Sequence, residues 1–77
     1  MYWRYKSAIG YLYIVPLKDG RFGFVYDDVV WESSDTPQIE ADNVACFCTG
    51  CFMWDILDCK VDYPSDLSEW ELCHETH

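Results

Sequence analysis

Hydrophobic and polar positions alternate along the first third of the chain, as they do in half-buried β-strands. Residues 2–5 alternate large aromatic side chains with a charge, and residues 11–15 are rich in aromatic and β-branched side chains. Residues 21–26 place three aromatic side chains on one side of a strand, and residues 29–32 provide a further partner strand. The pattern therefore predicts an antiparallel meander of three or four strands over residues 2–32.

Two short turns separate these stretches. Asp19-Gly20 supplies the positive φ angles that a tight connection between two strands needs. Asp27-Asp28 makes a second turn, before the last of the predicted strands. The connections are therefore short, as an antiparallel meander allows.

The hydrophobic positions change to a helical period in residues 37–47. Apolar residues fall on one side of this segment, and two acidic residues, Glu40 and Asp42, are expected to point outward. Asp35 or Thr36 can accept the free backbone N–H groups of the first turn. We expect a short amphipathic helix that packs on one face of the sheet.

The rest of the chain has a weaker pattern. Residues 52–58 are apolar enough to be a helical turn or a strand packed on the core, and the pattern leaves both open. Leu67 and Trp70 lie three positions apart, like the anchors of a last helical turn. With 77 residues, the chain is long enough for one core. We therefore expect a single α+β domain over residues 1–77, with a packed, partly helical carboxyl segment over residues 52–72.

The charge of the chain is strongly negative and unevenly distributed. Fourteen acidic residues against five basic ones give a formal net charge of −9. Residues 1–26 carry a net +3, whereas residues 27–77 carry a net −12. Nucleic acid and anionic lipid both attract basic proteins, so this charge argues against direct nucleic-acid binding and against docking on a membrane. The uncharged run of residues 7–17 is also too short to span a bilayer.

The acidic residues of the second part of the chain are interleaved with apolar residues, which hold the carboxylates on the surface of a folded element. Carboxylates a few ångströms apart can occupy the Lys and Arg sites that a protein uses for phosphates. We therefore expect a surface that binds a basic nucleic-acid-binding host protein or complex, with exposed aromatic residues as anchors. The candidate partner-binding residues are Asp27, Asp28, Glu32, Asp35, Glu40, Asp42, Trp31 and Trp70.

The five cysteines offer a competing interpretation. An odd number cannot form a closed disulfide framework. Cys48-x-x-Cys51 resembles one arm of a structural zinc site, but such sites usually have two arms and no second pair balances it. We expect no cofactor, with Cys46 and Cys48 as small buried hydrophobic residues at a helix end. The alternative is a zinc site formed by Cys46, Cys48, Cys51 and Cys73.

The residue types that catalysis needs are sparse. The candidate histidine bases, His74 and His77, both lie at the extreme carboxyl end. Four glycines are too few for a glycine-rich phosphate loop, and no Ser or Cys has a positioned histidine in the sequence. An acidic pair such as Asp55 and Asp58 could serve as an acid–base pair, but such pairs are common on acidic surfaces. A chain this short also has little room to form a pocket that shields them from water, as catalysis would need. We therefore expect a non-enzymatic protein.

The chain contains several short motifs in a fixed order: Ser7-x-Ile9-Gly10, Asp19-Gly20-Arg21-Phe22-Gly23, Ala41-Asp42-Asn43-Val44, Trp54-Asp55-x-Leu57-Asp58 and Asp66-Leu67-Ser68-Glu69-Trp70. These motifs resemble a pattern in short, uncharacterised bacterial proteins, which often lie in prophages and other mobile elements. The resemblance covers about residues 5–70, and this chain departs from the pattern at residues 31–37 and at the cysteine cluster. The resemblance carries no activity that transfers residue by residue.

The resemblance bears on the expected class of function. Small, strongly acidic proteins from mobile elements are similar in class to anti-restriction and anti-CRISPR inhibitors, several of which imitate the charge of nucleic acid. It therefore implies a non-enzymatic inhibitor that binds a host nucleic-acid-handling defence complex through an acidic, nucleic-acid-mimicking surface. Residues 1–6 are aromatic and basic and lack the cleavage site of a signal peptide, so we expect the protein in the cytoplasm of the host cell.

Two alternative functions stay open. The chain can be a protein-interaction module that is stabilised by zinc or by its thiols. It can also be an acidic accessory or self-associating domain, whose charge keeps it soluble and which forms a homodimer.

Overall fold

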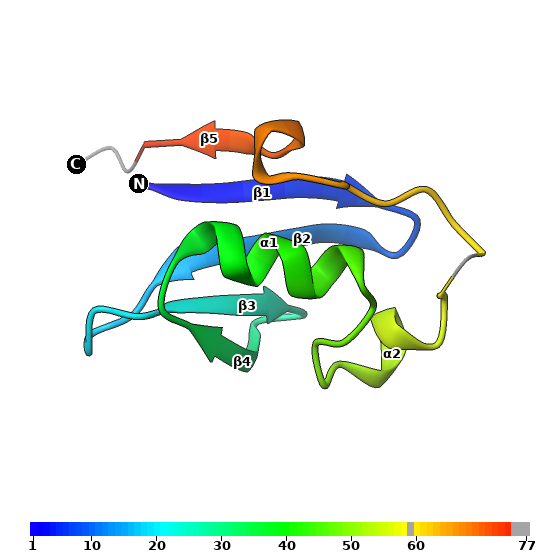
Figure 1. The fold of residues 1–77 in the computed structure, drawn as a ribbon, viewed down its shortest axis with the longest axis horizontal. Coiled ribbons are helices and arrows are strands. Elements are labelled where there is room, and N and C mark those ends of the chain that lie inside the picture. Colours follow the sequence, from blue (N-terminus) through cyan, green and yellow to red (C-terminus); the bar gives the residue numbers. More distant parts are fainter. Residues whose placement is uncertain (59, 75–77) are drawn as a thin grey trace.

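The computed structural model describes residues 1–58 and 60–74, and Figure 1 shows an antiparallel sheet with one main helix lying across it. The five strands follow the order β4-β3-β2-β1-β5. The predicted α+β class, with an antiparallel sheet and a short helix, is confirmed. The elements in chain order are β1 (Tyr2–Ser7), β2 (Gly10–Pro16), β3 (Phe22–Tyr26), β4 (Val29–Ser34), α1 (Pro37–Ala45), α2 (Phe52–Asp55), the 3₁₀ helix η1 (Leu67–Glu69) and β5 (Glu71–Cys73).

The carboxyl segment is less helical than expected. Helix α2 has four residues and η1 has three. The chain then runs antiparallel to β1, where Cys73 lies opposite Tyr2 and Glu71 lies opposite Arg4. Because β5 is three residues long and its partner strand lies at the other end of the sequence, no local pattern of apolar residues predicts it.

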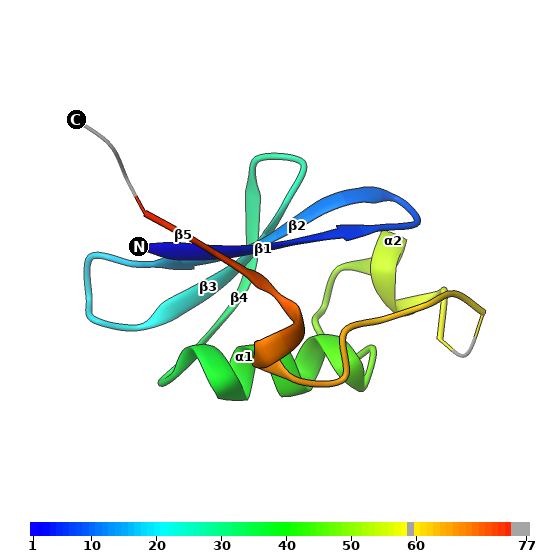
Figure 2. The ribbon, with the colours of Figure 1, turned by 90° about the horizontal axis from the view of Figure 1, so that it is seen from above.

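Helix α1 begins directly after its cap. The Thr36 hydroxyl accepts the backbone N–H of Ile39 at 3.1 Å, and Pro37 fills the first helical position, where the missing N–H costs nothing. Figure 2 places α1 and η1 on the same side of the sheet, which leaves the other face without a described helix. None of the helices in the described residues is long and apolar enough to cross a membrane.

The hydrophobic core lies between α1 and the covered face of the sheet. Alternate residues of β2 point into it, because neighbouring side chains on a strand face opposite ways. Trp54 of α2 is fully buried and stacks on Phe47, with ring centroids 4.6 Å apart. The core residues are Leu12, Ile14, Phe24, Ala41, Val44, Phe47, Cys51, Trp54 and Trp70.

Candidate acidic interface around strand β4

The first two candidate residues, Asp27 and Asp28, form the turn between β3 and β4. Their φ angles are 55° and 62°, and two successive positive φ angles are typical of the type I′ turn that matches the twist of a hairpin. Aspartate adopts this conformation more readily than most residues, because its short side chain bonds locally to the backbone. Both side chains are exposed, so the turn presents two adjacent carboxylates at one end of β4.

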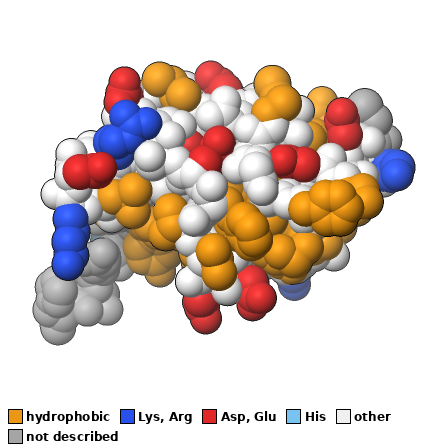
Figure 3. Space-filling model, turned by 90° about the horizontal axis from the view of Figure 1, so that it is seen from below, with side chains coloured by type: hydrophobic (Ala, Val, Ile, Leu, Met, Phe, Trp, Pro, Cys, Tyr) orange, Lys and Arg blue, Asp and Glu red, His pale blue; other side chains and the backbone are white. Residues whose placement is uncertain are grey.

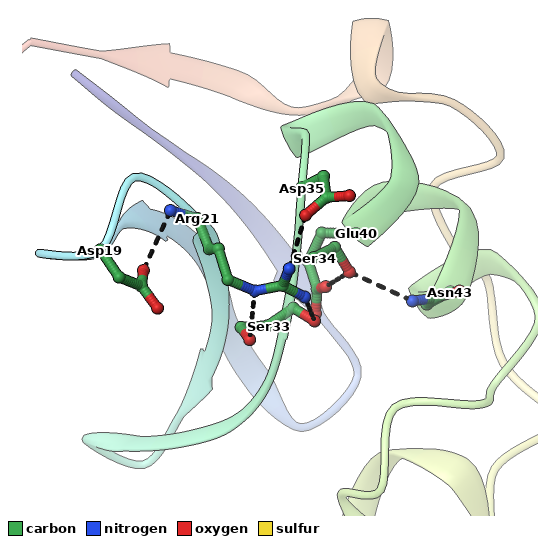
Figure 4. Close-up of polar contacts among 7 residues, drawn as sticks. All are labelled: Asp19, Arg21, Ser33, Ser34, Asp35, Glu40 and Asn43. Carbon is green, nitrogen blue, oxygen red and sulfur yellow. Dashed lines mark hydrogen bonds and ion pairs between the residues drawn. The ribbon is translucent and has the colours of Figure 1, made fainter.

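At the other end of β4, Asp35 lies beside a basic side chain (Figure 4). Arg21 Nη1 is 2.5 Å from Asp35 Oδ1, and the same guanidinium donates to the Ser33 carbonyl at 3.0 Å. Asp19 Oδ1 accepts the backbone N–H of Arg21 at 3.0 Å. An exposed ion pair of this kind contributes only about 0–1 kcal/mol to stability. Asp35 can therefore leave Arg21 and pair with a cation of a binding partner at a small cost in free energy.

The remaining surface members of the set are Asp42 and Trp31. Asp42 is exposed on α1 and accepts a hydrogen bond from the Gln38 amide at 2.8 Å. Trp31 is half-buried, and its indole N–H donates to the Tyr26 carbonyl at 3.0 Å. That bond fixes the ring, so one part of it packs on the core and the other part stays exposed.

Trp70 lies away from β4, directly after η1 and against Tyr5 of β1. It is 5% exposed, and its ring centroid lies 5.9 Å from that of Tyr5. The residue therefore contributes to the core in this conformation and presents almost no surface to a partner.

The two glutamates of the set point into the molecule. Glu40 has no exposed surface, so its expected outward orientation is wrong. It lies four positions before Val44, a core residue, and residues four apart share one face of a helix. Glu32 lies opposite Phe24 in the β3–β4 pair, and opposite residues point to the same face of a sheet. A register shift after Phe24 leaves Trp31 without a partner and makes this orientation possible.

The two carboxyl groups form a buried acidic pair. The Ser34 hydroxyl donates to Glu40 Oε2, and the Asn43 amide donates to Ser34 Oγ at 3.4 Å (Figure 4). Oε1 of Glu40 and Oε1 of Glu32 are both buried, and neither has a hydrogen-bond partner among the described residues. Burial raises the pKa of Glu40 to about 8; the Ser34 hydrogen bond opposes this rise and the neighbouring Glu32 adds to it. Glu40 therefore holds a proton at neutral pH, and the pair carries less charge than two exposed glutamates.

The basic residues of β1 lie away from this set. Arg4 and Lys6 alternate along the strand with Trp3 and Tyr5, which pack against the core, so they belong to the open face of the sheet. Arg4 Nε lies 2.6 Å from Glu71 Oε1 of β5. The fold thus separates the cations of the first strand from the carboxylates around β4 and α1.

Apolar side chains lie among these carboxylates. Figure 3 looks at the molecule from the side of β4 and shows hydrophobic side chains gathered in a band, with carboxylates around it. The sequence pattern suggested that residues 52–58 pack on the core, but Trp54 is the one buried residue of α2. The apolar patch, as we call it, consists of Val29 (46% exposed), Phe52 (70%), Met53 (40%) and Ile56 (49%).

A hydrogen-bonded loop holds α2 beside β4. The Asp55 carboxylate accepts the backbone N–H groups of Thr49 at 3.0 Å and Gly50 at 2.9 Å, and the Thr49 hydroxyl at 2.8 Å. Gly50 has a φ of +80°, and a Cβ at this position would lie 3.7 Å from the Trp31 carbonyl oxygen. The loop therefore passes directly alongside β4. In the sequence, this loop is marked only by a glycine, Gly50, that is followed five positions later by an acidic residue, Asp55.

Cys46 and Cys48 are exposed, which contradicts the expectation that they are buried. The reason is the backbone of Phe47, whose φ of 55° reverses the chain just after α1. This places the Phe47 ring in the core and leaves the two thiols beside it at the surface.

The four thiols of the alternative zinc site are not gathered at one place in the described residues. Cys51 is in the core, where burial raises the pKa of its thiol, and Cys73 lies on β5, at the opposite edge of the sheet from β4. Within residues 1–58 and 60–74, no three His, Cys, Asp or Glu side chains are grouped so that they could hold a metal ion. Cys59 and His77 lie outside the described residues.

Comparison with known proteins adds no relative, because no family model, no curated protein and no solved structure matches the chain. Function must therefore be inferred from the residues and their placement.

Proposed function

We propose that the protein is a non-enzymatic inhibitor from a mobile element, which acts in the host cytoplasm and binds a basic, nucleic-acid-handling defence complex in place of nucleic acid. The observation that carries this proposal is a set of four exposed carboxylates on consecutive elements around β4: Asp27, Asp28, Asp35 and Asp42. In the part of the chain that the structure describes, Arg21 is the one cation within ion-pair distance of this set. Sites that bind nucleic acid neutralise phosphates with Lys and Arg, and the same groups can bind carboxylates.

Regular structure, rather than a flexible tail, holds these carboxylates. Asp27 and Asp28 sit in a tight turn, and Asp42 belongs to a helix whose other side packs on the core. Charges that are fixed before binding lose little conformational freedom in the complex and also steer the encounter with a cationic surface. The resemblance to proteins of mobile elements makes a CRISPR surveillance complex the leading target class.

Removing two of the charges is expected to abolish most of the inhibition. The variant Asp27→Asn with Asp28→Asn keeps the turn, because asparagine also adopts positive φ angles readily. The measurement is plasmid interference in cells that carry a CRISPR surveillance complex. We expect the wild-type chain to restore transformation by a targeted plasmid, and the double variant to lower that restored efficiency by about tenfold or more.

The matched control is Asp19→Asn with Asp62→Asn, which removes the same charge from two exposed aspartates outside the set. Asparagine retains the oxygen that accepts the Arg21 N–H at position 19. We expect this control to inhibit like the wild type. Binding of the purified proteins is also expected to weaken steeply between about 0.1 M and 0.5 M salt, as the Debye length falls from about 10 Å towards about 4 Å. Equal losses in the two double variants, or an affinity that is indifferent to salt, would contradict the proposal.

A further inference from the structure

The apolar patch is not explained by an acidic surface alone. Each of its four side chains is at least 40% exposed, on a chain with a net charge of −9. Figure 3 shows the band that hydrophobic side chains form on this side of the molecule. Soluble proteins seldom leave large apolar side chains exposed together, and where they do the surface commonly binds a partner. The patch is therefore a candidate contact surface in its own right.

Both halves of the patch are firmly held. Trp54 points into the core, and its indole N–H donates to the Val44 carbonyl at 3.0 Å, which fixes the short helix α2. Phe52 and Met53 lie on the outer side of that helix. In β4, Val29 follows the tight turn of the hairpin directly. Side chains on such fixed elements lose less freedom on binding than side chains on a loop.

Carboxylates border the patch, and its centre is uncharged. Asp28 is exposed and directly precedes Val29, and Figure 3 shows carboxylates on both sides of the hydrophobic band. Glu32, the one acidic residue of β4, is turned towards the core by its pairing with Phe24. An apolar centre inside a charged rim is the usual anatomy of a protein–protein interface. The sign of the rim selects a partner with basic residues at the matching positions.

We infer that the apolar patch is the anchoring site of the proposed interface, and that it receives an apolar side chain projecting from a protein surface rich in Lys and Arg. A second copy of the chain fits less well, because a two-fold contact would bring the aspartate rims of two chains with net charge −9 together. The identity of the partner rests on the proposed function. The chemistry of its surface can be tested separately.

The probe is a synthetic helical peptide with leucine on one face and lysine on the other. A peptide of the same length and charge, with glutamine in place of leucine, is the reference. Each is titrated into the full chain and followed by amide chemical shifts. We expect the leucine peptide to bind at least about tenfold more tightly, with the largest shifts at the apolar patch. Phe52→Ala is expected to weaken the leucine peptide about fivefold to tenfold and to leave the glutamine peptide unchanged.

The matched control is Leu72→Ala, which removes an apolar side chain of 46% exposure from β5, at the other edge of the sheet. It is expected to bind both peptides like the wild type. Val29→Thr is a second test from a different element and preserves the shape of the side chain. Equal affinities for the two peptides, or wild-type affinity in both patch variants, overturn the inference.

Analytical ultracentrifugation of the same proteins tests whether a second copy of the chain binds the patch instead. A concentration-dependent dimer that Phe52→Ala abolishes assigns the patch to a second copy and overturns the inference as well. The failure of the two proposals can be told apart. Peptide binding at the patch without any plasmid protection rejects the proposed function and leaves the inference standing. Plasmid protection that depends on Asp27 and Asp28 but is unaffected by Phe52→Ala rejects the inference alone.

Discussion

Replacing Glu40 by glutamine is expected to stabilise the protein at neutral and alkaline pH and to flatten its stability between pH 4.5 and pH 8. Glu40 is fully buried, and the pKa of its carboxyl group rises from an ordinary 4.5 to about 8 in the folded state, mainly through burial. Between these two values the folded protein holds a proton that the unfolded chain has lost. The stabilisation is therefore fully present below pH 4.5 and is lost as the pH rises through 8.

The expected loss across this range is on the order of a few kcal/mol, because the pKa rises from 4.5 to about 8 and one pKa unit corresponds to about 1.4 kcal/mol. Glutamine has almost the same shape and offers an N–H group to the neighbouring carboxylate at every pH. The measurement is the free energy of unfolding in urea at a series of pH values. The wild type is expected to lose stability towards pH 8, while Glu40→Gln stays nearly level.

An exposed glutamate provides the matched control. The pKa of Glu71 is lowered, first by its hydrogen bond with Arg4, so this residue contributes stability above its unfolded pKa and loses it only as the pH falls through the lower folded value. Glu71→Gln is therefore expected to change the acidic end of the curve slightly and to keep the wild-type slope between pH 4.5 and pH 8. A wild-type protein whose stability is level over that range would contradict the proposed proton on the buried pair.

Local patterns were enough to predict the first four strands and the helix. Each of these elements has its own period of apolar residues, and the connections contain residue types that suit positive φ angles, such as Asp27-Asp28. The amino-terminal cap could also be anticipated, because one of the two named residues, Thr36, accepts the free backbone N–H of Ile39 in the first turn of α1.

Contacts between residues that are far apart in the sequence could not be predicted from such local patterns. Strand β5 forms because Cys73 and Glu71 meet Tyr2 and Arg4, and a three-residue strand has too few positions to show a period. The orientation of Glu32 depends on a register shift between β3 and β4, which cannot be read from either strand alone.

The candidate surface was predicted in part, because residue type was taken as a guide to exposure. Glu40 was assigned to the surface as an acid, although its spacing from Val44 places it on the buried side of the helix. The apolar segment of residues 52–58 was expected to pack on the core, yet Phe52 within it is 70% exposed. In both cases the tertiary position of the element decided the outcome. The positions of the exposed carboxylates and of the apolar patch both depend on how the elements pack together, and this packing cannot be predicted from composition alone.

Replacing Trp54 by alanine is expected to lower the free energy of unfolding by about 3–5 kcal/mol, the usual cost of removing a large aromatic side chain from a core. Trp54 has no exposed surface, stacks on Phe47 and donates its indole N–H to the Val44 carbonyl at 3.0 Å. Truncation leaves a cavity beneath α2 and a buried carbonyl without its donor, and each adds to the cost. The measurement is urea unfolding followed by far-ultraviolet circular dichroism.

Phe52, two positions earlier in the same short helix, gives a matched control because it is also aromatic but 70% exposed. Phe52→Ala is expected to change the free energy of unfolding by no more than about 0.5 kcal/mol, as a surface substitution does. A similar cost for the two variants would mean that Phe52 also supports the fold, and stability alone would then explain the presence of an aromatic residue at this position. A large cost for Trp54 and none for Phe52 is the result that the inferred contact requires, because the exposed ring of Phe52 is then free to serve a partner without any loss of stability.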